Sequence, residues 1–271
     1  MRNFGTNYGI VDPDCPLNWD APLNRGLIGN WASVPNAGWT GGNKLYDLVR
    51  GGKTPHDGTL TGSWWQSEAE PDGRGVYFTG GAYAACGSVP LDSDNWTISL
   101  TFRPKSVGAY MRFLAWYGDG PTIWLDSAVN KFGLVHSSTV DFRFPWTAAA
   151  GVKYHLLISR TGSRIAGYNS GVESYTDNSF SASYTLDTSF RLGVSDSPYP
   201  NAADAVIYCA KVWNRGLTRD EAAAEYEEYR TKANFNWIKR PSSYFFDVGG
   251  GGTFQAAWAV GSNVVLQSGA Q

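Results

Sequence analysis

The sequence predicts an all-β fold: an antiparallel jelly-roll β-sandwich with one short α-helix on its C-terminal side and extended terminal arms. Segments rich in β-branched and aromatic residues recur at short intervals between residues 75 and 193, separated by turn formers, as is typical of a sandwich. With 271 residues and 42% hydrophobic content, the chain can form one large β domain with extensions. Helical spacing is clear only near residues 219–233.

The N-terminal part is predicted to be an arm, residues 1–24, because it is polar and contains X-Pro pairs that favour extended backbone. The first strand should begin at Leu27, and glycine pairs at 41–42 and 51–52 mark the loops that follow it. Further strands are expected at residues 75–78, 96–103, 112–116, 122–125, 132–136, 140–144, 154–160, 164–169 and 190–193.

Residues 204–213 are predicted to form a central strand. Apart from Asp204 and Lys211 the run is almost entirely apolar, which suits a strand that is buried on both faces.

A helix should begin at Arg219. Thr218 and Glu221 have the spacing of a capping box, in which each side chain bonds an otherwise unpaired backbone amide at the start of a helix. We expect Glu225 and the other charged residues to lie mostly off the apolar stripe, which consists of Ala222, Tyr226, Tyr229 and Ala233.

The C-terminal extension, residues 233–271, contains a glycine run at 249–252 that we expect to be a flexible joint, followed by a small hairpin that turns at 261–263. The main domain would then span residues 25–232. We expect the two terminal arms to contact neighbouring subunits, either in a homo-oligomer or with other subunits of a larger assembly.

The segment VWNRGLTRDEAAAEY (212–226) is similar to the closing segment of laminin-G-like domains of the concanavalin A type. Four more segments resemble the same family, in the order that it uses them: RGLIGNW (25–31), YDLVRGGKTPHDGTLTG (46–62), GVYFTGGAYAACG (75–87) and NWTISLTFRP (95–104). The resemblance covers roughly residues 25–230 and implies a concanavalin A-like jelly roll. Many members carry an acidic pair where this chain has Tyr208 and Cys209, which disfavours the family's calcium site.

Domains that resemble this one often bind glycans or other proteins, and the segment DAPLNRGLIGNW (20–31) is similar to structural proteins of tailed bacteriophages. We therefore expect a non-catalytic virion structural protein, made in the host cytoplasm, that decorates the capsid or tail and binds glycans or neighbouring subunits. One alternative is an extracellular protein, a secreted carbohydrate-binding module. A second alternative is a glycoside hydrolase or polysaccharide lyase.

Charge and cysteine usage exclude several classes of partner. The net charge is −2 and the 22 basic residues are scattered, so nucleic acid is not expected. No apolar run is long enough to cross a bilayer, and the N-terminus lacks the apolar core of a signal peptide, so we expect no membrane insertion and synthesis in a cytosol. Three widely spaced cysteines do not suggest a disulfide framework or a zinc site: Cys15, Cys86 and Cys209.

Catalytic motifs are not found in the sequence. The glutamates fall in predicted turns, a hairpin and the helix rather than in strands, and Asp92 and Asp94 are better explained as turn formers. The three histidines, His56, His136 and His155, do not have the spacing of metal ligands. We therefore expect no catalytic residues.

Aromatic residues near loops and strand ends are the candidates for stacking on sugar rings, although large aromatic side chains are more often part of a core. The glycan-binding candidates are Trp64, Trp65, Tyr83, Trp116, Tyr117, Trp146 and Tyr199, with Trp124 considered beside them. No cofactor is expected, but calcium is possible, since loop oxygens could bind it at Asn43, Asp47 and Asp57.

Overall fold

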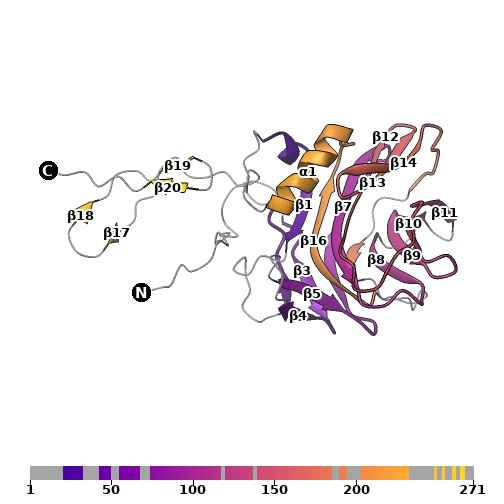
Figure 1. The fold of residues 1–271 in the computed structure, drawn as a ribbon, viewed down its shortest axis with the longest axis horizontal. Helices are drawn as coiled ribbons and strands as arrows, with labels where there is room; N and C mark the ends of the chain where they lie inside the picture. Colours follow the sequence, from indigo (N-terminus) through magenta and orange to yellow (C-terminus); the bar gives the residue numbers. More distant parts are fainter. Residues whose placement is uncertain are drawn as a thin grey trace.

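The computed structural model describes residues 21–32, 43–49, 55–67, 74–116, 120–136, 139–184, 189–193 and 203–231, together with four short strands between residues 247 and 265. Two antiparallel sheets face each other, and α1 (Arg219–Thr231) lies against the outer side of one of them (Figure 1). The predicted all-β jelly-roll sandwich is confirmed.

The first sheet has eight strands. Seven of them follow the order β14-β13-β12-β7-β16-β5-β4, and β1 pairs with the part of β16 that follows its pairing with β5. Its strands are β1 (Leu27–Ala32), β4 (Trp64–Ser67), β5 (Arg74–Phe78), β7 (Asn95–Pro104), β12 (Tyr154–Thr161), β13 (Arg164–Asn169), β14 (Val172–Asp177) and β16 (Ala205–Trp213).

The second sheet also has eight strands, in the order β11-β10-β9-β8-β15-β6-β3-β2. They are β2 (Lys44–Leu45), β3 (Gly58–Thr61), β6 (Tyr83–Ser88), β8 (Met111–Trp116), β9 (Thr122–Asp126), β10 (Lys131–His136), β11 (Thr139–Arg143) and β15 (Ser189–Leu192). Five strands of the two sheets were not predicted from the sequence: β2, β3, β4 and β6, which are short or rich in small residues, and β14 of the first sheet.

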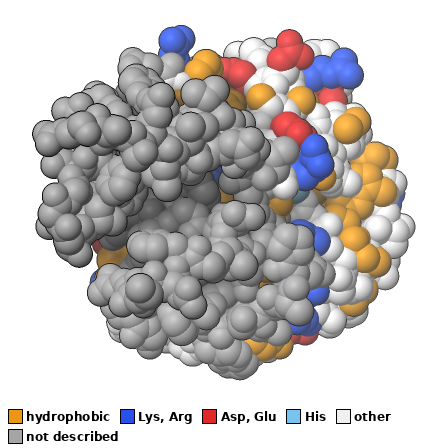
Figure 2. Space-filling view, turned by 60° about the vertical axis from the view of Figure 1, so that its left-hand side comes forward, with side chains coloured by type: hydrophobic (Ala, Val, Ile, Leu, Met, Phe, Trp, Pro, Cys, Tyr) orange, Lys and Arg blue, Asp and Glu red, His pale blue; other side chains and the backbone are white. Residues whose placement is uncertain are grey.

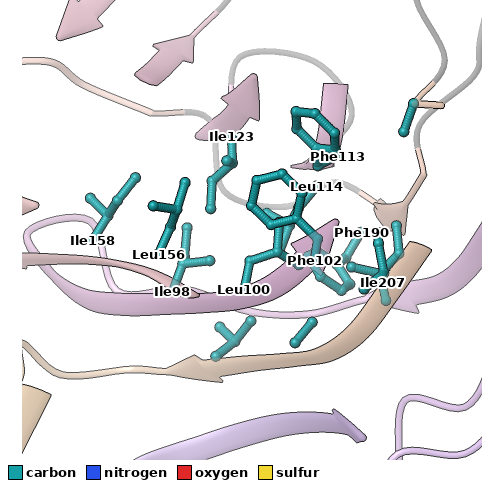
Figure 3. Close-up of a cluster of buried hydrophobic side chains, with 14 of the residues drawn as sticks. Ile98, Leu100, Phe102, Phe113, Leu114, Ile123, Leu156, Ile158, Phe190 and Ile207 are labelled. Atoms are coloured by element: carbon teal, nitrogen blue, oxygen red, sulfur yellow. The ribbon is translucent and has the colours of Figure 1, made fainter. Parts of the chain in front are cut away.

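The core lies between the two sheets. Ile98, Leu100 and Phe102 alternate along β7 and point towards side chains of the second sheet, among them Phe113 (Figure 3). The ring centroids of Phe102 and Phe113 are 4.5 Å apart. Burying each such side chain stabilises the fold by about 1.5–3 kcal/mol, so this layer fixes the inward and outward faces of every strand that contributes to it.

The strand β16 is central, as predicted, with all nine residues buried between β7 on one side and β5 and β1 on the other. Its last residue also anchors the chain that precedes β1. The indole Nε1 of Trp213 donates to the carbonyl oxygen of Leu23 (2.6 Å), in the short 3₁₀-helix Pro22–Asn24. The start of the described chain is therefore held at the end of the central strand.

The helix α1 begins at Arg219 through the predicted capping box. The backbone N–H of Thr218 donates to the carboxylate of Glu221 (2.9 Å), and the N–H of Glu221 donates to Thr218 Oγ1 (3.3 Å). The expectation that Glu225 lies off the buried stripe is wrong, because its side chain is only 1% exposed and faces the first sheet. Its partners on that sheet, described below, explain this burial.

Two small hairpins follow the domain in sequence: β17 (Asp247–Val248) pairs with β18 (Gly252–Thr253), and β19 (Trp258–Val260) pairs with β20 (Asn263–Val265). The second agrees with the hairpin predicted around residues 261–263. The glycine run was expected to be a flexible joint, but Gly252 lies in β18 and pairs with Val248. Gly249, Gly250 and Gly251 lie outside the described residues.

Candidate functional site

The outer face of the second sheet carries the residues that are best arranged to contact a ligand. Side chains alternate between the two faces of a strand, and on β9 Ile123 and Leu125 belong to the core, so Trp124 points outward. The same argument, applied to β6, β8, β11 and β15, places four more large side chains on this outer face: Tyr83, Arg112, Arg143 and Arg191.

Arg112, Trp124 and Arg143 lie in one line across this face. Arg112 on β8 is the cross-strand partner of Trp124 on β9. On the other side of Trp124 the line continues through Gly133 on β10 to Arg143 on β11.

Tyr83 on β6 extends this line in the other direction. β6 pairs with β15 as far as Leu192, and the next residue, Gly193, donates its N–H to the carbonyl oxygen of Phe113 (2.8 Å). Tyr83 lies at that level, beside the segment of β8 that carries Arg112. Because adjacent strands are roughly 4.8 Å apart, the three steps from β6 to β9 span about 14 Å. We call Tyr83, Arg112, Trp124 and Arg143 the cross-strand row.

Gly133 leaves a gap in the cross-strand row between Trp124 and Arg143. A Cβ atom on this glycine would lie 2.2 Å from the carbonyl oxygen of Phe142, because β11 approaches its backbone closely. No larger residue fits there without moving β11. The absence of a side chain lets the Arg143 guanidinium lie 5.9 Å from the centroid of the Trp124 ring.

Tyr110 covers Trp124 and presents its own ring to solvent. The two rings are stacked with centroids 5.6 Å apart and an interplanar angle of 10°. Trp124 is 9% exposed, whereas Tyr110 is 43% exposed, so Tyr110 is the ring that an approaching ligand meets first. The indole Nε1 of Trp124 is buried without a hydrogen-bond partner. Tyr110 was not predicted as a glycan contact. Its position just before β8 was the only feature of the sequence that indicated this role.

Tyr83 forms a second aromatic and arginine pair on the same face. The Arg191 guanidinium of β15 lies 4.7 Å from the centroid of the Tyr83 ring, within the range of a cation–π interaction. Tyr83 is partly exposed. Among the candidate glycan contacts whose side chains are described, Tyr83 and Trp124 lie on this face.

Asp126 holds the position of Arg143. Its Oδ2 accepts a hydrogen bond from Arg143 Nε (2.7 Å) and its Oδ1 accepts one from the backbone N–H of Ala128 (3.0 Å). The carboxylate is almost fully buried, while Arg143 is partly exposed. This contact engages Nε of the guanidinium, and charge-assisted bonds of this kind fix geometry well.

Comparison with known proteins identifies the family of this fold. Residues 78–223, more than half of the chain, match the family described as the concanavalin A-like lectin/glucanases superfamily, which includes laminin-G-like domains. The chain belongs to this superfamily. The matched part contains most of the second sheet, the whole cross-strand row and α1 as far as residue 223. No curated protein sequence matches the chain significantly.

Solved structures of the same fold include domain 4 of AbnA, a GH43 extracellular arabinanase from Geobacillus stearothermophilus, in complex with arabinotriose. It is 18% identical, with a TM-score of 0.55, and the match covers 73% of this chain and 97% of that domain. Trypanosoma rangeli sialidase matches with 16% identity and a TM-score of 0.55, over 76% of this chain and 33% of the sialidase. The chain therefore spans about one third of the sialidase. At these identities the likeness concerns the fold of the superfamily.

Two predicted glycan contacts have their rings inside the sandwich or against it. Trp116 is 1% exposed, its Nε1 donates to the carbonyl oxygen of Val89 (2.8 Å), and it packs on Phe190. It is thus a core residue and not a sugar contact, because it points inward from β8. Trp146 is stacked on Tyr154 with an interplanar angle of 4° and also packs against the core.

The other predicted glycan contacts cannot be placed on this face. The backbone of Trp64 and Trp65 lies in β4 of the first sheet, but their side chains lie outside the described residues, as do Tyr117 and Tyr199.

Asp47, predicted as a calcium ligand, closes a loop in the structure. It is fully buried, and its carboxylate accepts hydrogen bonds from the backbone N–H groups of Asn30, Val49 and His56, each 2.9 Å long. Burial raises the pKa of Asp47 to about 6. Asp57, the second predicted ligand, accepts a bond from the backbone N–H of Asp47 (3.0 Å).

Asn43, the third predicted calcium ligand, is exposed at the start of β2. Within the described ranges, no group of three or more His, Cys, Asp or Glu side chains could hold a metal ion.

A histidine–carboxylate pair lies at the end of β10. His136 Nδ1 is 2.6 Å from Asp141 Oδ1, and Asp141 Oδ2 accepts a bond from the Tyr184 hydroxyl (3.1 Å). Burial raises the pKa of Asp141.

Asp92 forms a turn, as predicted. It accepts bonds from the N–H groups of Asp94 and Asn95.

A buried polar cluster lies between α1 and the first sheet. The carboxylate of Glu225 is 2.7 Å from His155 Nε2 and 3.1 Å from Lys211 Nζ, and it accepts a bond from the Ser99 hydroxyl (3.3 Å). All four side chains are buried, so the cluster is closed to ligands and fixes the helix on the sheet. The signal for it was Lys211, because a lysine in a strand buried on both faces needs a carboxylate partner.

No helix among the described residues is long and apolar enough to span a bilayer. The surface on the side of α1 carries acidic and basic side chains next to one another over its described part (Figure 2). On the outer face of the second sheet, the large described side chains include the aromatic and arginine residues of the cross-strand row.

Proposed function

We propose that this chain is a non-catalytic glycan-recognition domain whose ligand lies along the cross-strand row. The observation that carries the proposal is the stack of Tyr110 on Trp124, at the same level of one sheet face as Tyr83. Aromatic rings on a flat sheet face stack on the apolar faces of sugars, and neighbouring arginines bond sugar hydroxyls. A span of about 14 Å between the two aromatic positions suits a short oligosaccharide.

Membership of a superfamily that includes lectins supports this proposal. The AbnA domain that shares the fold was solved in complex with arabinotriose. That ligand belongs to the other protein, so arabinotriose serves here as one probe among many.

A hydrolase or lyase is less well supported by the described carboxylates of the second sheet. Glycoside hydrolysis ordinarily needs two carboxyl groups that flank one bond. Asp126 is bound to Arg143, Asp141 is bound to His136 and Tyr184, and both are almost fully buried. Neither is placed to protonate or attack a ligand on the outer face.

A glycan array with the full chain tests the proposal, followed by titration of the best ligand against variants. Tyr110→Ala and Tyr83→Ala should each weaken binding about fivefold, the loss of roughly 1 kcal/mol of stacking. The matched control is Tyr77→Ala, a tyrosine on the outer face of the first sheet with Lys105 5.9 Å from its ring centroid. Equal affinities for all three variants, or no glycan bound, would refute the proposal.

We also propose that the domain is part of a virion, as the resemblance to phage structural proteins implies. Secretion as a carbohydrate-binding module is the alternative setting. Light scattering of the full chain and of a variant without residues 1–24 and 249–271 tests the role of the arms. An oligomeric full chain and a monomeric trimmed chain would support assembly through the arms, and two monomers would contradict it.

A further inference from the structure

The described strand residues that point outward from the second sheet include more basic than acidic side chains. Among the described strand residues that point outward there, one is acidic, Asp126, and it is bound to Arg143. The chain as a whole carries a net charge of −2, so this face differs in sign from the molecule. The basic side chains on the face are Lys44, Arg112, Lys131, Arg143 and Arg191.

Each aromatic position of the cross-strand row has an arginine against it. Arg191 lies over Tyr83 at 4.7 Å, and Arg143 lies over the Trp124 ring at 5.9 Å. Arg112 stands between them as the cross-strand partner of Trp124. The same unit, a ring with a guanidinium beside it, thus occurs twice along about 14 Å of the sheet.

A guanidinium presents a planar fork of N–H donors that matches a carboxylate, and it is less strongly hydrated than an ammonium group. A sugar that stacks on one ring would place a carboxylate substituent within reach of the neighbouring arginine. A neutral sugar would stack on the rings and bond the arginines through its hydroxyls, without a charged partner for the guanidinium. Low dielectric near a partly buried sheet face strengthens the charged contact relative to one in bulk water.

We infer that the cross-strand row binds acidic oligosaccharides, in which successive sugars carry carboxylates, in preference to neutral ones. The inference rests on the proposed function, because it assigns a ligand class to the same face. Rings supply the stacking, and Arg112, Arg143 and Arg191 supply the charge selectivity.

The test compares two ligands with the same sugar backbone, trigalacturonate and its uncharged, fully methyl-esterified form, each titrated calorimetrically into the full chain. The acid should bind at least about tenfold more tightly than the ester, since a hydrogen bond between charged groups contributes more than a neutral one. Raising the salt concentration from 50 to 200 mM, chosen as test conditions, should weaken binding of the acid and leave binding of the ester unchanged.

Arg112→Gln should remove most of the preference for the acid, because it weakens binding of the acid several times more than binding of the ester. Arg112→Lys should restore part of this preference, because it returns the charge without the planar fork. The control is Arg164→Gln, which breaks a surface pair with Glu173 on the first sheet and should change neither affinity. Thermal unfolding of each variant checks that the fold is retained.

Equal binding of the acid and the ester would overturn the acidic preference and leave a neutral glycan domain, so the proposed function would stand. Binding of the acid that Arg112→Gln and Arg164→Gln weaken equally would assign the effect to overall charge and overturn the role of the row. If neither ligand binds and the glycan array is also empty, both the inference and the proposed function fail.

Discussion

Glu225 of α1 and His155 of β12 meet in the interior, with Glu225 Oε2 2.7 Å from His155 Nε2. Lys211 of β16, which is separated from β12 by β7, contacts the same carboxylate at 3.1 Å. The rings of Tyr226 and Tyr229 lie against the imidazole, with centroids 5.1 and 5.4 Å from it. The helix is therefore attached to the first sheet through a charged contact that water does not reach.

Glu225→Ala should lower the free energy of unfolding by about 3–5 kcal/mol, because it leaves Lys211 buried without its carboxylate. Urea denaturation followed by tryptophan fluorescence measures the loss. Glu227→Ala is the control, since Glu227 pairs with Arg230 on the exposed surface of the helix and its variant should keep the wild-type midpoint. Equal midpoints for the two variants would contradict the role of the cluster.

Acid should weaken this attachment at low pH. Burial alone would raise the pKa of Glu225, but His155 and Lys211 outweigh it and lower the pKa to about 2. Because the folded pKa lies below the unfolded value near 4.5, the stabilisation is complete above about pH 4.5 and is lost as the pH falls towards 2. The difference in unfolding free energy between the wild type and Glu225→Gln should shrink by about 3 kcal/mol over that window. A difference in unfolding free energy that does not change with pH would contradict the lowered pKa of Glu225.

Asp47→Ala should open the loop that Asp47 closes. The variant leaves the backbone N–H groups of Asn30, Val49 and His56 without their acceptor, and a buried unpaired amide costs about 1–3 kcal/mol. We expect a total loss of at least about 3 kcal/mol by urea denaturation, together with faster hydrogen exchange at these amides. If those amides stay as protected as in the wild type, the loop is held by other contacts.

Gly133→Ala should disrupt the pairing of β10 with β11, since the added Cβ would lie 2.2 Å from the carbonyl oxygen of Phe142. A substitution that forces backbone apart in a packed sheet typically costs about 1–3 kcal/mol. Gly108→Ala is the matched control, because a Cβ there meets nothing within 4 Å. Thermal unfolding should show a clearly lower midpoint for Gly133→Ala only, and a weaker glycan affinity should accompany it.

The strand–turn–helix unit could be predicted because its signals are local. Thr218 and Glu221 specify the start of α1 through bonds that involve only four residues, and the apolar run of β16 requires burial wherever the strand lies. Glu225 was misplaced for a different reason. It stands three residues after Ala222 and one before Tyr226, so helical spacing put it on the buried stripe, and only its charge argued against that position.

The candidate site was harder to predict because it depends on register between strands distant in sequence. Tyr83 and Trp124 were considered as residues that stack on sugar rings. Nothing in the local sequence shows that they share one face of the sheet or that Trp116 points the other way. A shift of one residue reverses the face of every side chain on a strand. Tyr110 lies in a loop, where no periodicity predicts its contact with Trp124.

The position of β16 affects how the chain can fold during synthesis. Trp213 at its end bonds to Leu23, 190 residues earlier, and β1 pairs along β16. The first strand therefore leaves the ribosome long before its partner exists, and the first sheet remains split until the last strand of the sandwich has been made. Sheets joined by such distant contacts fold slowly. Completion of this domain is thus an event after translation of α1, and until then β1 has an exposed edge that a chaperone or an identical chain could bind.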